Sequence, residues 1–247
     1  MKPIIKVCGM RDADNIRAVE ALGADWMGFI FWPGSKRYVA RPSGYLPIKA
    51  KRVGVFVDAS IDDILRHVIE YRLDVIQLHG HETPDYIQKL RAVFHAPHHE
   101  NCNCPACKGL ATMPLLIKAF SIATPRDLAA TEAYAGLADY FLFDTKAAPV
   151  LDAFTSGSPM AKAAPSPPGG TGCQFDWSIL DKYDGSTPFL LSGGIGANDA
   201  QRLRALRALD GFPIEQCVGI DLNSRFEVAP ALKDINKLKE FIKELSI

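Results

Sequence analysis

Eight short apolar runs recur along the chain at fairly even spacing, and this repetition limits the folds that are open to it. The runs cover residues 3–9, 26–32, 52–58, 74–80, 114–120, 139–145, 188–194 and 217–223. Each is almost continuous in apolar and β-branched residues, which is typical of strands in a parallel sheet that helices cover on its outer side.

Helical patterns fill most of the gaps between these runs. The segment 12–24 begins with Asp12 as a cap and places Ile16, Val19 and Leu22 on one stripe. Similar patterns occupy 60–72, 83–94, 124–136, 196–209 and 231–245. Eight strands with helices between them, in a chain of 247 residues, predict one α/β domain over 1–247, a (β/α)8 TIM barrel. A doubly wound open sheet is the alternative, but the even repetition favours the barrel.

Two gaps are too long for a plain strand–helix unit, and we interpret them as insertions. Residues 95–113 follow the helix expected at 83–94, which places them on the face of a barrel away from the chemistry. Residues 147–168 follow the strand at 139–145 directly, on the face where barrels form their active sites. Their Ala, Pro, Ser and Gly content is typical of a loop, so this segment is either a lid or an insertion without a role.

The first insertion holds a cluster of possible metal ligands: His95, His98, His99, Cys102, Cys104 and Cys107. The spacing between Cys104 and Cys107 is common among zinc ligands, whereas that between Cys102 and Cys104 is not. Because the cluster is expected far from the chemistry, any zinc bound there would be structural. We expect no cofactor and no catalytic metal.

Composition narrows the class of protein further. The formal net charge is zero, which argues against a nucleic-acid or anionic-membrane partner. No apolar run reaches the roughly 18 residues that span a bilayer, and the N-terminal run is too short for a signal peptide. The six cysteines do not form a disulfide framework. We therefore expect a cytoplasmic protein with reduced thiols.

Polar residues at the carboxyl ends of the strands are the candidates for chemistry, because these ends meet at the active face of a barrel. They are Cys8, Arg37, Asp58, His79, Asp144, Gly193, Gly194 and Asp221. Cys8 and His79 could instead be core residues, and we expect Asp58 to cap the helix that begins near Ser60. Asp144 ends a wholly apolar strand, so its carboxyl group must either have a partner or have a raised pKa. Together, a thiol, a carboxyl group, a histidine and an arginine form the composition of an acid–base site.

Glycine-rich stretches supply a second signal. They occur at 167–177, before the seventh strand, and at 191–199 and 219–225, after the seventh and eighth strands. Barrels often bind phosphate through the backbone N–H groups of the loops after those last two strands. The alternative is that these glycines only permit tight turns.

Several motifs, taken in order, resemble those of the N-(5′-phosphoribosyl)anthranilate isomerase family of tryptophan biosynthesis. They are "KVCGM", "ADWMGFIFWPGSKRYV", "VGVFVD", "IQLHG", "FDT", "GGTG…FDW", "LSGGI" and "GIDLNSRFE". The resemblance covers almost the whole chain and lapses only in the two insertions. It implies a (β/α)8 barrel that performs an Amadori rearrangement, in which an aminoaldose phosphate becomes a 1-deoxyribulose phosphate, without a cofactor.

The resemblance also implies roles for individual residues. Cys8 matches the family's general base, and Asp144 matches its general acid. Arg37 matches the arginine that holds the anthranilate carboxylate. Substrate-binding positions match His79, Gly193, Gly194 and Asp221, and the phosphate loop after the eighth strand corresponds to Asn223 and Ser224. In that loop the chain departs from the usual Ser-Ser-Gly, because Asn223, Ser224 and Arg225 stand there.

Two alternatives remain open at this point. The related isomerase of histidine biosynthesis performs the same rearrangement on another aminoaldose. That family looks to use two aspartates as its acid and base, so the cysteine at position 8 argues against this alternative. A metal-binding or regulatory barrel, whose function depends on the His/Cys cluster, is the alternative of a different class.

Overall fold

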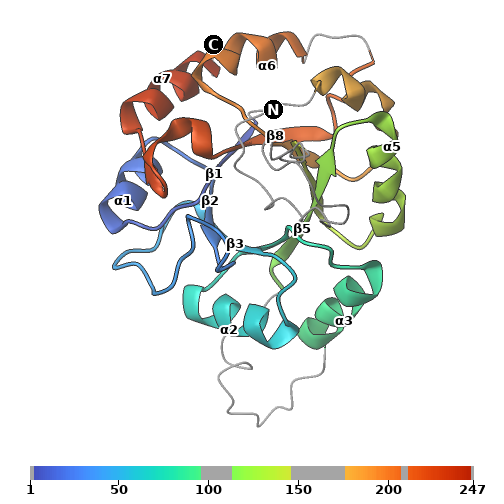
Figure 1. Ribbon diagram of the computed structural model, residues 1–247, viewed down its shortest axis with the longest axis horizontal. Coiled ribbons are helices and arrows are strands. Elements are labelled where there is room, and N and C mark those ends of the chain that lie inside the picture. The colour runs from blue at the N-terminus through green and yellow to red at the C-terminus, as the bar shows by residue number, and fades with distance from the viewer. Residues whose placement is uncertain (1–2, 96–112, 146–175, 207–210, 246–247) are drawn as a thin grey trace, which may run out of the picture.

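The computed structural model describes residues 3–95, 113–145, 176–206 and 211–245, and its eight main strands form a closed parallel barrel in sequence order (Figure 1). The strands are β1 (Ile4–Cys8), β2 (Trp26–Ile30), β3 (Lys51–Phe56), β4 (Val75–Leu78), β5 (Leu115–Ile122), β6 (Tyr140–Thr145), β7 (Phe189–Leu191) and β8 (Cys217–Leu222). Each lies within, or within two residues of, one of the eight apolar runs. The predicted (β/α)8 barrel is confirmed.

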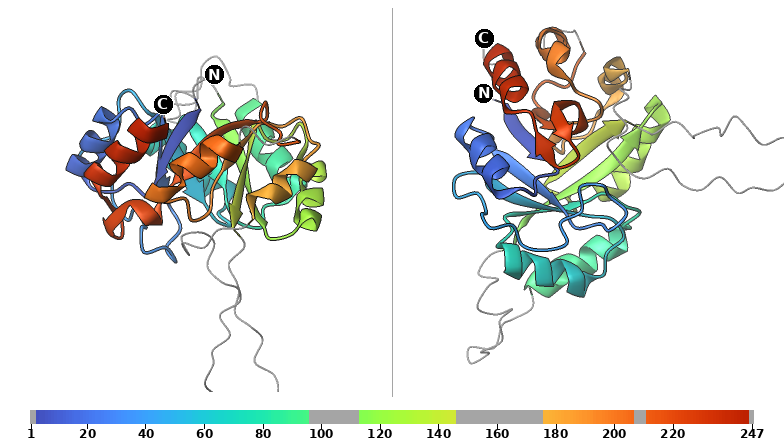
Figure 2. Two further views of the ribbon diagram at one scale, coloured as in Figure 1. Left: turned by 90° about the horizontal axis from the view of Figure 1, so that it is seen from above. Right: turned by 60° about the vertical axis from the view of Figure 1, so that its left-hand side comes forward.

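Helices surround the barrel on its outer side (Figure 1). They are α1 (Ala13–Ala21), α2 (Ile61–Tyr71), α3 (Pro84–His95), α5 (Pro125–Leu128), α6 (Ala200–Leu206) and α7 (Ile235–Leu245). Short 3₁₀ helices add η1 (Ala129–Tyr134), η2 (Trp177–Lys182), η3 (Ala197–Asp199) and η4 (Ser224–Phe226), and β9 (Glu227–Ala229) pairs with β10 (Leu232–Lys233) after β8. Figures 1 and 2 show α7 beside α1, where the ring of helices closes.

The helix expected at 124–136 differs from the pattern. It is an α-helix only over α5 and continues as the 3₁₀ helix η1. The Thr131 hydroxyl donates to the Leu128 carbonyl three residues earlier, at 2.6 Å, which favours the tighter winding. The connection from β2 to β3 contains no helix, and η2 occupies the outer layer before β7.

The apolar interior has two layers that follow the alternation of side chains along each strand. Outward-facing residues such as Phe141, Phe143 and Phe189 pack against the helices. Inward-facing residues fill the barrel itself: Cys8, Trp26, Ile30, Val53, Val55, Val75, Ile117, Ala119, Leu142 and Leu190. Because the barrel is filled, open space for a ligand is found above it, at the carboxyl ends of the strands.

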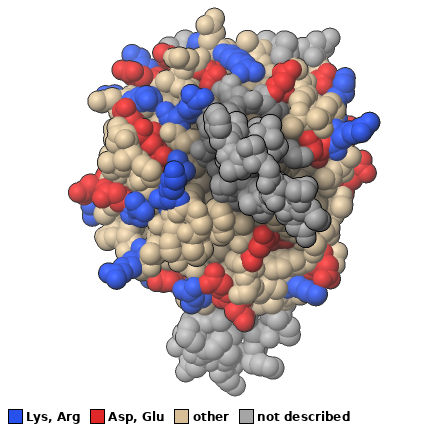
Figure 3. Space-filling view, in the orientation of Figure 1, with Lys and Arg blue, Asp and Glu red and all other residues tan. Residues whose placement is uncertain are grey.

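Acidic and basic side chains intermix on the face shown in Figure 3, in line with the formal net charge of zero. Among the described helices, none is both long enough and apolar enough to cross a membrane. The side chains of the His/Cys cluster at 95–107 and the whole segment 147–168 lie outside the described residues, so the zinc site and the lid stay predictions.

Candidate active site

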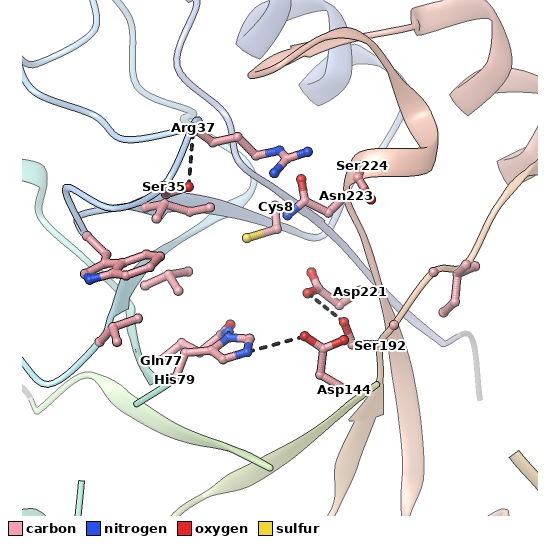
Figure 4. Close-up of a pocket in the computed structure, with 17 residues that line it drawn as sticks. Cys8, Ser35, Arg37, Gln77, His79, Asp144, Ser192, Asp221, Asn223 and Ser224 are labelled. Carbon is pink, nitrogen blue, oxygen red and sulfur yellow. Dashed lines mark hydrogen bonds and ion pairs between the residues drawn. The ribbon is translucent and has the colours of Figure 1, made fainter. Parts of the chain in front are cut away.

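One cavity lies at the carboxyl ends of the barrel strands, and all nine residues to which the resemblance gives a role line it (Figure 4). They are Cys8, Arg37, His79, Asp144, Gly193, Gly194, Asp221, Asn223 and Ser224. The cavity measures about 740 Å³, part of it open to solvent. Residues up to 216 positions apart in the chain (8 to 224) therefore share one site. This convergence follows from the parallel barrel, in which all strands end on the same face.

Cys8 is the last residue of β1, and the residue is only 4% exposed. Gly28 on the neighbouring strand β2 provides the space for it, because a Cβ atom on Gly28 would lie 2.7 Å from the Cys8 Sγ atom. Burial raises the pKa of the Cys8 thiol above its ordinary value, while the positive charges of Lys6 and Lys233 act in the opposite direction. The site thus contains a buried thiol among cationic groups.

Asp144, near the end of β6, has partners at both carboxyl oxygens. Its Oδ1 accepts the Thr145 backbone N–H at 2.8 Å, and its Oδ2 lies 3.4 Å from the Nε2 atom of His79 (Figure 4). The Gln77 Nε2 atom in turn lies 2.8 Å from the His79 Nδ1 atom. If the Gln77 amide donates to Nδ1, neutral His79 carries its proton on Nε2, toward Asp144. Asp144 is therefore a partnered carboxyl group, one of the two alternatives that its position in the sequence left open.

Arg37 forms a bidentate ion pair that its sequence position does not reveal. Its Nε lies 2.8 Å from Glu227 Oε1 and its Nη2 lies 2.6 Å from Glu227 Oε2. Lys233 contacts the same carboxylate, with Nζ 2.7 Å from Oε1. Burial alone would raise the pKa of Glu227, but its bonds to Arg37 and the nearby Lys233 charge lower it below the usual value. Glu227 is consequently an ionised group that orients the guanidinium.

The glycine pair after β7 has the backbone conformation that only glycine adopts readily. Gly193 and Gly194 have φ angles of 88° and 63°. A Cβ atom on Gly193 would overlap the Thr145 hydroxyl, so that position is closed to larger residues. Across the cavity, Lys233 donates to the Asn223 side-chain oxygen at 2.9 Å and thereby fixes the loop after β8. Both loops line the cavity, and together they form a cradle at the place where barrels often bind a phosphate.

Below this cradle lies a buried ion pair. Lys6 on β1 is fully buried, and its Nζ atom lies 2.7 Å from Asp221 Oδ1 on β8. The Ser192 hydroxyl is 3.3 Å from the other oxygen of Asp221. A buried carboxylate requires such partners, because leaving it unpaired is costly. Asp221 is thus held in a fixed position at the cavity floor.

Several polar residues of this site were absent from the sequence-based candidates, among them Lys6, Gln77, Ser192, Glu227 and Lys233. For Lys6 and Gln77 a signal existed, because each is a polar residue in an apolar strand two positions before Cys8 or His79, and alternation places it on the same face. Glu227 and Lys233 belong to the β9–β10 hairpin, which no strand pattern indicated.

The expectation for Asp58 is wrong. Ser60 caps α2, since its side chain accepts the Asp63 N–H. Asp58 has a φ angle of 49°, and its carboxylate accepts the His81 N–H at 2.6 Å instead. The left-handed backbone turns the Asp58 side chain toward the loop after β4 and away from the helix start, and Asp58 is not among the residues that line the cavity.

Comparison with known proteins identifies the family. The model of the family described as N-(5′-phosphoribosyl)anthranilate (PRA) isomerase matches residues 5–108 and 110–244. The N-(5′-phosphoribosyl)anthranilate isomerase of Phocaeicola vulgatus is 46% identical over 242 residues, covering 98% of this chain and 97% of that protein. The corresponding protein of Parabacteroides distasonis is 42% identical, covering 98% and 93%.

A solved structure extends the comparison to a bound ligand. A phosphoribosyl anthranilate isomerase in complex with reduced 1-(o-carboxyphenylamino)-1-deoxyribulose 5-phosphate has a TM-score of 0.66 and 25% identity, covering 98% of this chain and 97% of that one. With a family model that spans most of the chain, relatives above 40% identity and a matching barrel, this chain belongs to the N-(5′-phosphoribosyl)anthranilate isomerase family.

Proposed function

We propose that this cavity converts N-(5′-phosphoribosyl)anthranilate to 1-(2-carboxyphenylamino)-1-deoxyribulose 5-phosphate, with Asp144 as general acid and Cys8 as general base. The observation that carries the proposal is the convergence of this acid and this thiol on one cavity that also contains Arg37 and the glycine cradle. Family membership and the ligand of the related solved structure support the same reaction.

The first step opens the furanose ring. The carboxyl group of Asp144 donates its proton to the ring oxygen, the bond from C1′ to that oxygen breaks, and the anthranilate nitrogen supplies the electron pair that forms a C1′ iminium ion. His79 lies 3.4 Å from Asp144 and is placed to share this proton. Because Asp144 is only 6% exposed, the proton is donated away from bulk water.

The second step removes a proton from C2′. The Cys8 thiolate takes this proton and becomes a thiol, and the electrons of the broken C–H bond neutralise the iminium to give an enolamine. The iminium is itself the electron sink, so acid–base groups suffice for this chemistry. In the final tautomerisation C1′ gains a proton and the C2′ hydroxyl loses one, which gives the ketose.

Two anchors hold the substrate across this chemistry. The anthranilate carboxylate pairs with the outer Nη1–Nη2 edge of Arg37, since Glu227 already occupies the Nε side of the guanidinium. The phosphate binds the loops after β7 and β8, through Gly193, Gly194, Asn223 and Ser224. The reaction then needs a small-molecule substrate and no nucleic acid, membrane or cofactor, and we propose that it takes place in the cytoplasm.

The direct test is the reaction itself. Purified protein is added to freshly generated phosphoribosylanthranilate, and the loss of its fluorescence is followed with a coupling enzyme that consumes the product. Saturable turnover supports the proposal. Turnover of the histidine-pathway aminoaldose, with none of phosphoribosylanthranilate, would replace it with the alternative isomerase.

Arg37→Ala is expected to act mainly on KM. Loss of a charge-assisted bidentate pair should raise KM roughly tenfold or more, and Arg37→Lys should not restore it because an ammonium lacks the planar fork. Arg66→Ala serves as the control, since Arg66 lies on α2 with a side chain 61% exposed. A fall in kcat at unchanged KM would contradict the assignment of Arg37 to binding.

Inorganic phosphate is expected to inhibit competitively with the substrate, because it fills the cradle after β7 and β8. Gly193→Ala should weaken this inhibition, since the added methyl group meets Thr145 and the positive φ angle disfavours alanine. Initial rates at several phosphate concentrations, with chloride at matched ionic strength as the control, provide the measurement. Non-competitive inhibition, or none, would count against this phosphate site.

A further inference from the structure

Lys6 is a charged residue inside a barrel whose inner layer is mostly apolar. It is fully buried on β1, and alternation along the strand places its side chain on the same inward face as Cys8. The inner layer around it is built from residues such as Trp26 and Val53. An ammonium group in such surroundings is costly unless it is paired, and Asp221 supplies an ion pair.

The charges that face the Cys8 sulfur come from four elements. The cations are Lys6 on β1, Arg37 in the loop after β2 and Lys233 on β10, and the anion is Asp221 on β8. Asp144 on β6 and His79 after β4 line the same cavity. Of the two ammonium groups, Lys233 is bonded to Glu227 and Asn223. Lys6 lies two residues before Cys8 on the same face of β1, and its positive charge favours the thiolate.

We propose that Lys6 is a positioning residue that holds Cys8 as a thiolate for proton abstraction. When Cys8 releases its proton to solvent, the Lys6 ammonium lies between two anions, the sulfur and the Asp221 carboxylate, and donates to both. Asp221 and Ser192 keep the ammonium in this position. The inference rests on the proposed role of Cys8 as general base.

The two members of the ion pair have opposite effects on the thiol. Burial is the largest influence on the pKa of Cys8 and raises it. The positive charge of Lys6 lowers this pKa, and the negative charge of Asp221 raises it further. Removing Lys6 should therefore make the thiol harder to ionise, and removing the charge of Asp221 should make it easier. A purely structural role of the pair predicts no such opposition.

The experiment measures the ionisation of Cys8 without substrate. Iodoacetamide alkylation is followed as a function of pH by mass spectrometry of the peptide that contains Cys8, in the full-length protein. For Lys6→Met we expect the midpoint of the alkylation rate against pH to rise by about one pH unit or more. At a fixed pH below the midpoint, this is roughly tenfold slower alkylation. For Asp221→Asn we expect the midpoint to fall. Lys89→Met, on α3 with a side chain 67% exposed, changes the net charge equally and should leave the midpoint unchanged.

The outcomes separate this inference from the proposed function. An unchanged or lowered alkylation midpoint in Lys6→Met overturns the inference about Lys6. If circular dichroism shows that Lys6→Met does not fold, Asp221→Asn decides instead, and an unchanged or raised midpoint in that variant overturns the inference. In the folded Lys6→Met variant, kcat should fall with little change in KM, and the acid limb of its pH profile should move by the same amount as the alkylation midpoint. Full activity of a Cys8→Ala variant would instead remove the general-base role, whatever the alkylation shows.

Discussion

Cys8→Ala is expected to lower kcat by at least about 10²-fold, the usual scale for a positioned acid or base. Alanine removes the group that takes the C2′ proton and leaves the anchors at Arg37 and Gly193 in place, so KM should change little. The kcat/KM of the unmodified enzyme should rise with pH as Cys8 ionises, because the thiolate is the active form. Steady-state kinetics of the purified variant, with circular dichroism to check its fold, is the measurement.

Cys217→Ala is the matched control for this experiment. Cys217 is the other cysteine among the described residues, and it opens β8 at the end of the barrel opposite the cavity. The same substitution there should leave kcat within a few-fold of the unmodified enzyme. Near-normal kcat in Cys8→Ala would show that another group is the base.

Asp144→Asn is expected to lower kcat by a similar factor of at least about 10². The amide keeps the size of the carboxyl group and can still accept the Thr145 N–H at the position of Oδ1. It cannot donate the proton that ring opening requires. Single-turnover measurements should locate the loss in the ring-opening step rather than in substrate binding.

Asp181→Asn provides the comparison. Asp181 lies on η2 with a side chain 42% exposed and pairs with its neighbour Lys182. The same change of charge at this surface position should leave kcat unaffected. If Asp144→Asn had the same kcat as Asp181→Asn, another acid would have to open the ring, and His79 is the nearest candidate.

The barrel and the membership of its cavity follow from local patterns in the sequence. Apolar runs of strand length stay buried wherever they pair, so their number and spacing predict the closed parallel sheet. Since parallel strands end on one face, a residue such as Cys8, Asp144 or Asp221 reaches the cavity by its place at or next to a strand end. No contact had to be known for that inference.

The ion pairs of the site could not be predicted in this way. Lys6 and Asp221 are 215 positions apart, and Arg37 and Glu227 are 190 apart. Charged residues are mostly exposed, and only the register of β1 on β8 shows that Lys6 has a buried partner opposite it. Asp58 is a case in which a local rule gave the wrong answer. Its position suggested that it caps the start of α2, but its left-handed φ angle turns the side chain toward His81.

The sequence by itself determined the strand number, the parallel barrel and which candidate residues at strand ends reach the cavity, because hydrophobic periodicity and strand ends are local properties. The tertiary structure alone decided which charged partner each of these residues has: Lys6 for Asp221, Glu227 for Arg37, and His79 for Asp144. The physical reason is that burial and ion pairing depend on side chains brought together from distant strands, and these set the protonation and direction of each group.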